Sequence, residues 1–195
     1  MDPALLGVST AFGLAAAAGL NTTLPLLIVG VLGRLGLLGL AAPFDTLTFD
    51  VTLLGLALLA VFEVVSDKVP GWDSAVHAIQ WPLAAAAGAI LFASQSAAIN
   101  WVSPEITVLI GVVTAGGVHA VRMAVRPLVT GASIGMGNPL LSAAEDVYAV
   151  VLAVAAVFAP ALALLFLALL LGGAALATVV VRQGGGRLGR KTMAS

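Results

Sequence analysis

The densest group of chemically active side chains lies between Glu63 and His77. Glu63 and Asp67 are four residues apart, and so are Asp73 and His77, so each pair shares one face of a helix. Carboxylates and imidazoles at this spacing can exchange protons or bind a cation. Since residues 58–62 are all apolar, the carboxyl group of Glu63 is expected one turn deeper than that of Asp67, where it needs a polar partner.

Three cationic or titratable side chains are available as partners of Glu63, namely Lys68, His119 and Arg122. Arg122 and Arg126 are four residues apart and precede a glycine-rich segment. Two arginines beside such a segment can hold a phosphate group through guanidinium and backbone N–H donors. A simpler interpretation is that these arginines, like Asp67 and Lys68, are ordinary charges at the edge of a membrane.

A third polar group follows at Asn138, Ser142, Glu145 and Asp146. The spacing of Ser142 and Glu145 is that of a capping box, which predicts a helix N-terminus at this point. In the alternative, Glu145 and Asp146 join Asp67 and Asp73 as oxygen ligands of a hard cation. None of these spacings is diagnostic of a metal, so the sequence leaves a metal site undetermined.

Known catalytic templates are missing from the chain. It contains no G-x-S-x-G, no H-E-x-x-H, no P-loop spacing and no cysteine. We therefore expect no enzyme and no cofactor, while a bound cation stays compatible with the acids.

The elements that position these residues follow from the composition. Of the 195 residues, 61% are apolar and 9% are charged, and the mean hydropathy is +1.16. A soluble domain carries roughly 25% charged residues, so this chain cannot cover itself with a polar surface. The sequence predicts an all-α, polytopic bundle of transmembrane helices. With a net charge of −1 and no basic domain, nucleic acid is not an expected partner.

Seven apolar segments approach the roughly 17–25 residues that a spanning helix needs. They are residues 3–20, 24–40, 51–66, 82–101, 106–120, 147–159 and 161–181. Six spans plus a re-entrant segment are the alternative. Residues 1–181 then form one transmembrane domain, and residues 182–195 form a basic cytoplasmic tail. The first segment lacks a positively charged start, so we expect a retained helix and no signal peptide.

The orientation follows from the positions of Lys and Arg. The basic tail places the C-terminus in the cytoplasm, and counting back through seven spans places the N-terminus outside. Every Lys and Arg except Arg34 then falls on the cytoplasmic side, together with the turn at Asn21. The polar site is therefore expected at the cytoplasmic ends of the helices.

A weak internal repeat is a further expectation. Asp2-Pro3 and Ser103-Pro104 open similar segments, and residues 19–21 (GLN) are similar to residues 117–119 (GVH). Such a repeat predicts a parallel arrangement of three, one and three helices.

Three motifs occur in order along the chain: G-L-N-x-x-x-P-L from Gly19, E-x-x-x-D-K-x-P-x-x-D-x-x-x-H from Glu63, and G-N-P-x-x-S-x-x-E-D from Gly137. Together they resemble a family of small bacterial membrane proteins catalogued as a domain of unknown function, DUF4126. The resemblance covers nearly the whole chain, and it implies a multi-pass protein of the bacterial inner membrane without an assigned reaction. The second motif is also faintly similar to the E-x-G-D-K motif of a cation/proton exchanger family, with one residue more and Ser66 in place of the glycine.

Three functions agree with these features. The first is a secondary transporter coupled to protons or cations, with Glu63 as the titrating group. The second is a protein that binds or flips a lipid or polyprenyl phosphate through Lys68, Arg122 and Arg126. The third is a non-catalytic scaffold whose glycine-rich helices pack against partners. Carboxylates outnumber cations in the polar groups, which favours the transporter.

The expected partners are membrane lipids, a small ion or an anionic lipid headgroup, and a second copy of the chain. The expected binding residues are Asn21, Glu63, Asp67, Lys68, Asp73, His77, His119, Arg122, Arg126, Asn138, Glu145 and Asp146.

Overall fold

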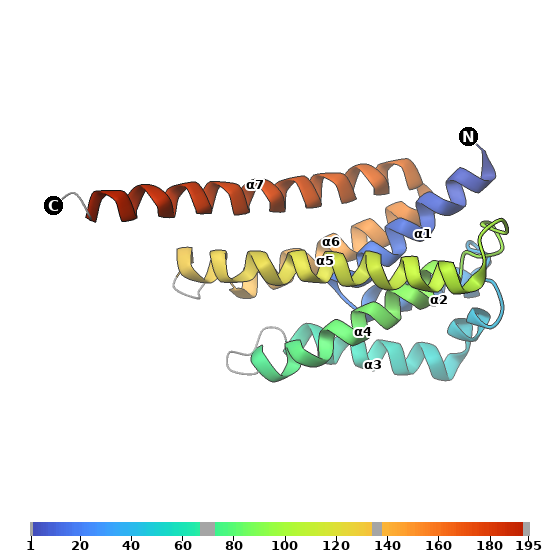
Figure 1. Ribbon diagram of the computed structural model, residues 1–195. Helices are drawn as coiled ribbons and strands as arrows, with labels where there is room; N and C mark the ends of the chain where they lie inside the picture. Colours follow the sequence, from blue (N-terminus) through green and yellow to red (C-terminus); the bar gives the residue numbers. More distant parts are fainter. Residues whose placement is uncertain (1, 67–72, 134–137, 193–195) are drawn as a thin grey trace.

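The computed structural model describes residues 2–66, 73–133 and 138–192. Within these ranges the chain forms seven α-helices, one short 3-10 helix and no strand, which confirms the all-α prediction. The elements are α1 (Pro3–Leu20), α2 (Thr23–Arg34), η1 (Phe44–Thr48), α3 (Asp50–Ser66), α4 (Asp73–Ala93), α5 (Pro104–Ser133), α6 (Asn138–Phe158) and α7 (Pro160–Thr192). Successive helices run back and forth, and the two termini lie at opposite ends of the molecule (Figure 1).

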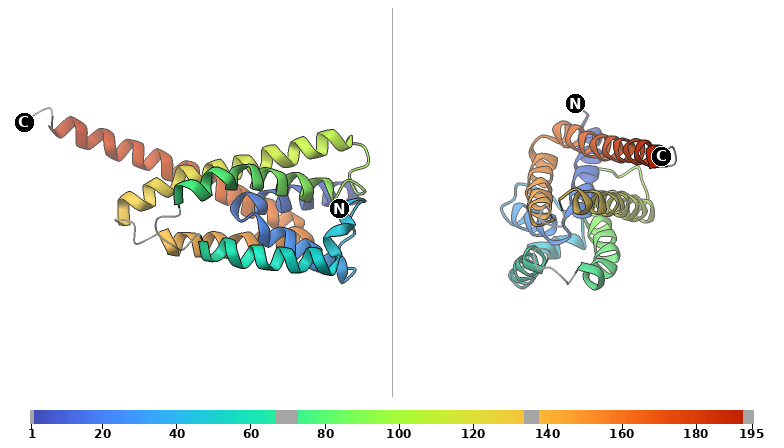
Figure 2. Two further views of the ribbon diagram at one scale, coloured as in Figure 1. Left: turned by 90° about the horizontal axis from the view of Figure 1, so that it is seen from below. Right: turned by 90° about the vertical axis from the view of Figure 1, so that its left-hand side faces the viewer.

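The central helix of the bundle is α1. It packs against α2, α4, α5, α6 and α7, which surround it in Figure 2. Residues 13–21 are all buried, and most of them are alanine or glycine. At Gly19 a Cβ atom would lie 2.5 Å from the carbonyl oxygen of Ala115 on α5. Glycine at this position therefore lets the C-terminal end of α1 rest directly on the backbone of α5.

A second close approach joins α4 to α5. A Cβ atom at Gly111 on α5 would lie 2.4 Å from the carbonyl oxygen of Gly88 on α4. On the other side of the bundle, α3 packs mainly on α2 and η1. Helices α3 and α4 both lie in the lower part of the molecule in Figure 1, but Figure 2 shows them apart, and they are held by different helices.

Five helices differ in extent from the sequence prediction. Helix α7 runs from Pro160 to Thr192, past the predicted end at residue 181 and into the predicted tail. Helix α2 ends at Arg34, short of residue 40, and α4 starts at Asp73 and continues through Pro82 to Ala93. Helix α5 continues to Ser133, and α6 begins at Asn138. The predicted bounds of α5 and α6 stop just short of the charged residues Arg122 and Asp146. Charged side chains that face partners inside a bundle do not interrupt a helix, so both helices continue through these residues.

Two of the helices contain stretches that are long and apolar enough to cross a membrane, judged by length and composition. They are Pro104–Pro127 in α5 and Pro139–Phe158 in α6. Shorter apolar stretches occupy α1, α2, α4 and the first part of α7.

Candidate functional site

The site is organised by the sharp turn between α1 and α2. The backbone N–H of Asn21 donates to the carbonyl of Ala17 at 3.1 Å, at the end of α1. The side-chain Oδ1 of Asn21 accepts from the backbone N–H groups of Thr23 (3.1 Å) and Leu24 (2.9 Å). Asparagine is a preferred capping residue, because its side chain satisfies N–H groups that lack a partner within the helix. One residue therefore ends α1 and begins α2.

This turn lies inside the bundle and not at its end. Arg122, which bonds to the turn, is followed by 11 more residues of α5, and Asp146, which also bonds to it, is preceded by eight residues of α6. At about 1.5 Å per residue these lengths are about 16 Å and about 12 Å. Figure 1 shows α5 and α6 continuing past the end of α1. The site was predicted at the helix ends because the predicted segments ended at residue 120 and began again at residue 147, whereas α5 and α6 continue past these residues.

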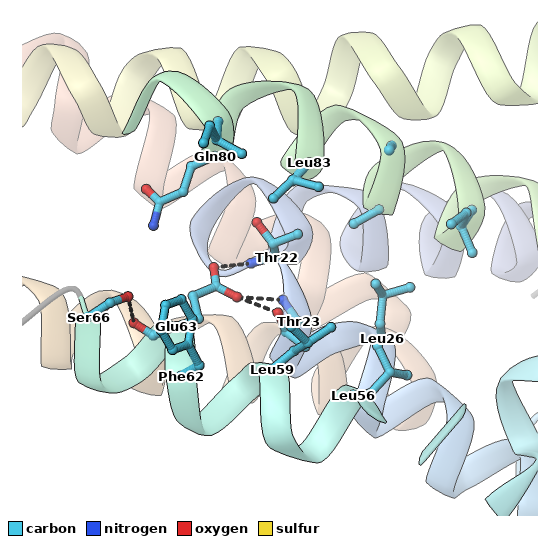
Figure 3. Close-up of a pocket in the computed structure, with 14 residues that line it drawn as sticks. Thr22, Thr23, Leu26, Leu56, Leu59, Phe62, Glu63, Ser66, Gln80 and Leu83 are labelled. Atoms are coloured by element: carbon cyan, nitrogen blue, oxygen red, sulfur yellow. Dashed lines mark hydrogen bonds between the residues drawn. The ribbon is translucent and has the colours of Figure 1, made fainter. Parts of the chain in front are cut away.

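Glu63 on α3 reaches the first residues of α2. Its Oε1 accepts from the backbone N–H of Thr22 at 2.9 Å, and its Oε2 accepts from the N–H of Thr23 at 3.0 Å and from the Thr23 hydroxyl at 2.5 Å. These bonds are drawn in Figure 3. The side chain is buried. A negative charge is favourable here because helix N-termini carry a partial positive charge.

Arg122 on α5 serves the opposite helix end. Its Nη1 donates to the carbonyl oxygen of Leu20 at 2.7 Å, which satisfies an acceptor in the last turn of α1. Its Nε donates to Oε2 of Glu145 at 2.7 Å, and Nη2 of Arg126 donates to the same oxygen at 2.9 Å. A cation therefore stands at the C-terminal end of α1, where the helix dipole favours one.

A further bond connects α6 to the turn. The Asn21 side-chain Nδ2 donates to Oδ1 of Asp146 at 3.0 Å. His119, one turn before Arg122, and Ser142, one turn before Asp146, are both fully buried. The turn thus receives side chains from three other helices.

A pocket of about 500 Å³ opens on the α3 side of the turn, between α2, α3 and α4. Its walls are formed by Leu26, Leu56, Leu59, Phe62, Ile79, Leu83, Ala86, Ala87 and Ile90, and its polar lining residues are Thr22, Thr23, Glu63, Ser66 and Gln80. Gln80 on α4 faces the Glu63 carboxylate across this space (Figure 3). The pocket is therefore an apolar cavity with polar groups gathered at one side.

The structure brings six of the expected site residues together around the turn: Asn21, Glu63, Arg122, Arg126, Glu145 and Asp146. His119 lies on the same helix as the two arginines. Asp67 and Lys68, and the side chains of Asp73, His77 and Asn138, lie outside the described residues.

The capping box predicted at Ser142 and Glu145 is wrong. Because α6 begins at Asn138, both residues lie within the helix, and Glu145 pairs with the two arginines. Among the residues that the structure describes, no three His, Asp or Glu side chains could hold a metal ion together. The hard-cation alternative also needs Asp67 and Asp73, whose side chains lie outside the described residues.

Sequence reasoning missed Thr22, Thr23 and Gln80 as parts of the site. The run Asn21-Thr22-Thr23-Leu24-Pro25 carries a usable signal, because a capping residue followed by proline within the first turn is typical of a helix start. The backbone N–H groups of Thr22 and Thr23 then need an acceptor, which Glu63 on α3 supplies. Gln80 gives no such signal.

Comparison with known proteins gives one result. The family model described as "Domain of unknown function (DUF4126)" matches residues 8–180, which include the turn, the ion pairs and the pocket. No curated protein and no solved structure shows a significant match to the chain. Since the match extends over most of the sequence, the chain belongs to the DUF4126 family.

Proposed function

We propose that the chain is a polytopic protein of the bacterial inner membrane, with its N-terminus outside and its C-terminus in the cytoplasm. Support comes from the distribution of side chains between core and surface, which is the reverse of that in a soluble protein. The central helix is built from buried alanine and glycine, whereas large apolar side chains such as Val51 (85%), Leu58 (65%) and Val113 (65%) are exposed. A soluble protein rarely exposes large contiguous apolar areas, whereas lipid would cover them. The orientation rests on the Lys and Arg positions.

Within the membrane, the proposed function is secondary transport coupled to protons or cations. The observation that carries this proposal is the turn between α1 and α2 inside the bundle, with Arg122 at one helix end and Glu63 at the other. Helix ends that meet charged groups inside the membrane are how many transporters hold substrates and ions. A carboxylate at such a depth is costly and by default suggests function.

The bonding of Glu63 suits a group that gains and loses a proton. A hydroxyl can both donate and accept. The Thr23 hydroxyl donates to the carboxylate in the structure, and after rotation it can accept from the protonated acid. A proton that leaves Glu63 would leave a negative charge beside the pocket, and a cation that binds there in its place would couple the two movements.

Other charged groups bond to the same turn from different helices. Arg122 comes from α5 and bonds to Leu20, and Asp146 comes from α6 and bonds to Asn21. Glu145 on α6 pairs with Arg122, and the buried His119 lies one turn before Arg122 on α5. On the pocket side, the polar residue that α4 contributes among the described side chains is the neutral Gln80. Among the side chains that the structure describes, Glu63 is thus the acid that faces the pocket.

The full chain reconstituted in vesicles with a trapped pH dye tests this function. With an acidic interior, external Na⁺, K⁺, Mg²⁺ or tetraphenylphosphonium is added in turn. We expect at least one cation to drive protein-dependent loss of internal protons, and we expect Glu63→Gln to abolish it. Glu105→Gln, which changes an exposed acid at the start of α5, is the matched control and should retain the response. A wild-type protein that responds to none of these cations would overturn the proposal.

A lipid-binding function is the second candidate, because the pocket walls are apolar. The phosphate would have to bind to Arg122 and Arg126, and both already donate to Glu145. Phospholipid that remains bound through purification in wild type, and is lost in Arg126→Gln, would favour this candidate over transport.

A further inference from the structure

We infer that the pocket between α2, α3 and α4 binds a lipophilic organic cation, whose positive centre pairs with Glu63. This inference rests on the proposed function and names the substrate class of its site. Three properties of the pocket lead to it: the size and walls, the charge at its polar side, and the surface onto which it opens.

The size and walls select an organic molecule. A volume of about 500 Å³ falls within the roughly 300–1,000 Å³ of small-molecule sites. The walls are mostly carbon atoms of leucine, isoleucine, phenylalanine and alanine. A bare inorganic cation such as Ca²⁺ needs about six to eight oxygen ligands, whereas Glu63 is the one carboxylate among the described lining residues. A hydrophobic body fits the walls instead.

The charge at the polar side selects a cation. Glu63 is 9% exposed, and in the described part of the chain its partners are neutral: two backbone N–H groups and one hydroxyl. Buried charges are normally paired with an opposite charge. A carboxylate offers about four acceptor positions, so a position remains on Oε1 next to the single bond from Thr22. A positive centre in the pocket completes this pairing.

The same charge excludes the other ligand classes. An anionic headgroup would be repelled by Glu63, and a neutral hydrocarbon would gain nothing from its charge. Exchange with a proton preserves the net charge, because protonated Glu63 carries the same charge as ionised Glu63 together with a bound monovalent cation. The inference therefore predicts that cation and proton compete for one group.

The opening selects a lipophilic molecule. Phe62, Ile79 and Leu83 line the pocket and are also exposed, at 58%, 62% and 51%. The pocket therefore reaches the apolar outer surface between α3 and α4. These two helices are held by different neighbours, α3 by α2 and η1, and α4 by α5 and α1. A molecule that partitions into the membrane can enter from the side.

Binding of tetraphenylphosphonium to the full chain in a neutral detergent tests the inference. Equilibrium dialysis compares this cation with the uncharged triphenylphosphine oxide. We expect the cation to bind at least about tenfold more tightly, and we expect Glu63→Gln to weaken its binding by about tenfold or more, because the amide has no charge to pair with the phosphonium centre. Retained folding of the variant is checked by size-exclusion chromatography and circular dichroism.

A second variant leaves the carboxylate in place. Ala86 is an exposed residue that lines the pocket, so Ala86→Phe fills the space and should also weaken binding by about tenfold. Ala120→Phe makes the same change at an exposed position on α5 that does not line the pocket, and it should bind like wild type. If Glu63→Gln does not fold, this pair carries the test.

The outcomes separate the inference from the proposed function. Equal binding by wild type, Glu63→Gln and Ala86→Phe, or equal binding of the charged and uncharged probes, overturns the inference. If tetraphenylphosphonium does not bind but Na⁺, K⁺ or Mg²⁺ drives proton exchange in vesicles, the inference is wrong and the transport function stands. If the cation binds with the expected variant pattern and moves no protons, the inference stands and the transport function fails.

Discussion

The two sides of the α1–α2 turn hold a buried acid in different ways. On the side of α5 and α6, Glu145 lies between Arg122 and Arg126, so its charge is balanced within the protein. On the side of α3, Glu63 is bonded to neutral donors at the start of α2 and borders a pocket. The first arrangement pairs its acid within the protein, and the second is the one for which we propose a proton or a ligand as the counter-charge.

The largest effect is expected from Arg122→Met. This change removes the donor to the Leu20 carbonyl and one of the two cations that neutralise Glu145. Breaking a buried ion pair by removing one partner costs about 3–5 kcal/mol. We expect a loss of this size in the free energy of unfolding, measured by denaturation in detergent. A loss below about 1 kcal/mol would contradict a structural role for this side of the turn.

A smaller effect is expected from Glu63→Gln. The amide keeps the shape of the side chain, but its NH₂ group must face one of the two N–H donors of Thr22 and Thr23. Leaving such a buried group unsatisfied costs about 1–3 kcal/mol. In the same denaturation experiment, the variant should be less destabilised than Arg122→Met. The reverse order would mean that Glu63 is the structural acid and that the comparison is inverted.

An exchange of residues tests the bond between the turn and α6. Asn21→Asp keeps the acceptor that caps α2 but places a carboxylate against Asp146. We expect this variant to be destabilised and the double variant Asn21→Asp/Asp146→Asn to recover part of the loss, because the new asparagine can donate to the new aspartate. Residues in direct contact show coupling of about 0.5–3 kcal/mol. A double-mutant cycle measures it, and additive effects would show that the two side chains do not interact.

The smallest effect is expected from Arg34→Gln. Arg34 forms an ion pair with Asp50 at the opposite end of the molecule, and both side chains are at least half exposed. Exposed pairs contribute about 0–1 kcal/mol. The unfolding free energy of this variant should therefore stay close to that of wild type. A loss comparable to that of Arg122→Met would show that burial does not distinguish the two ion pairs.

Local features of the sequence determined a large part of the fold. The bounds predicted for the first and third helices match α1 and α3 within one residue, because Asp2-Pro3 and Asp50 are helix-start signals that act within one turn. The break at Asn21 was also visible in the sequence. The composition led to the all-α prediction, and the residue types and motifs pointed to most of the polar residues that meet at the turn.

Tertiary structure alone decided where in the bundle the site lies and which side chains meet there. The apolar pattern predicted that one helix ends at residue 120 and the next begins at residue 147, which placed Arg122 and Glu145 outside the helices. In the structure both residues lie within α5 and α6. Whether a polar side chain ends a helix or points inward depends on a partner that is distant in the chain, as Glu145 is for Arg122 and Thr23 is for Glu63. The pocket has the same origin, since its walls come from three helices whose spacing is set by their contacts with other helices.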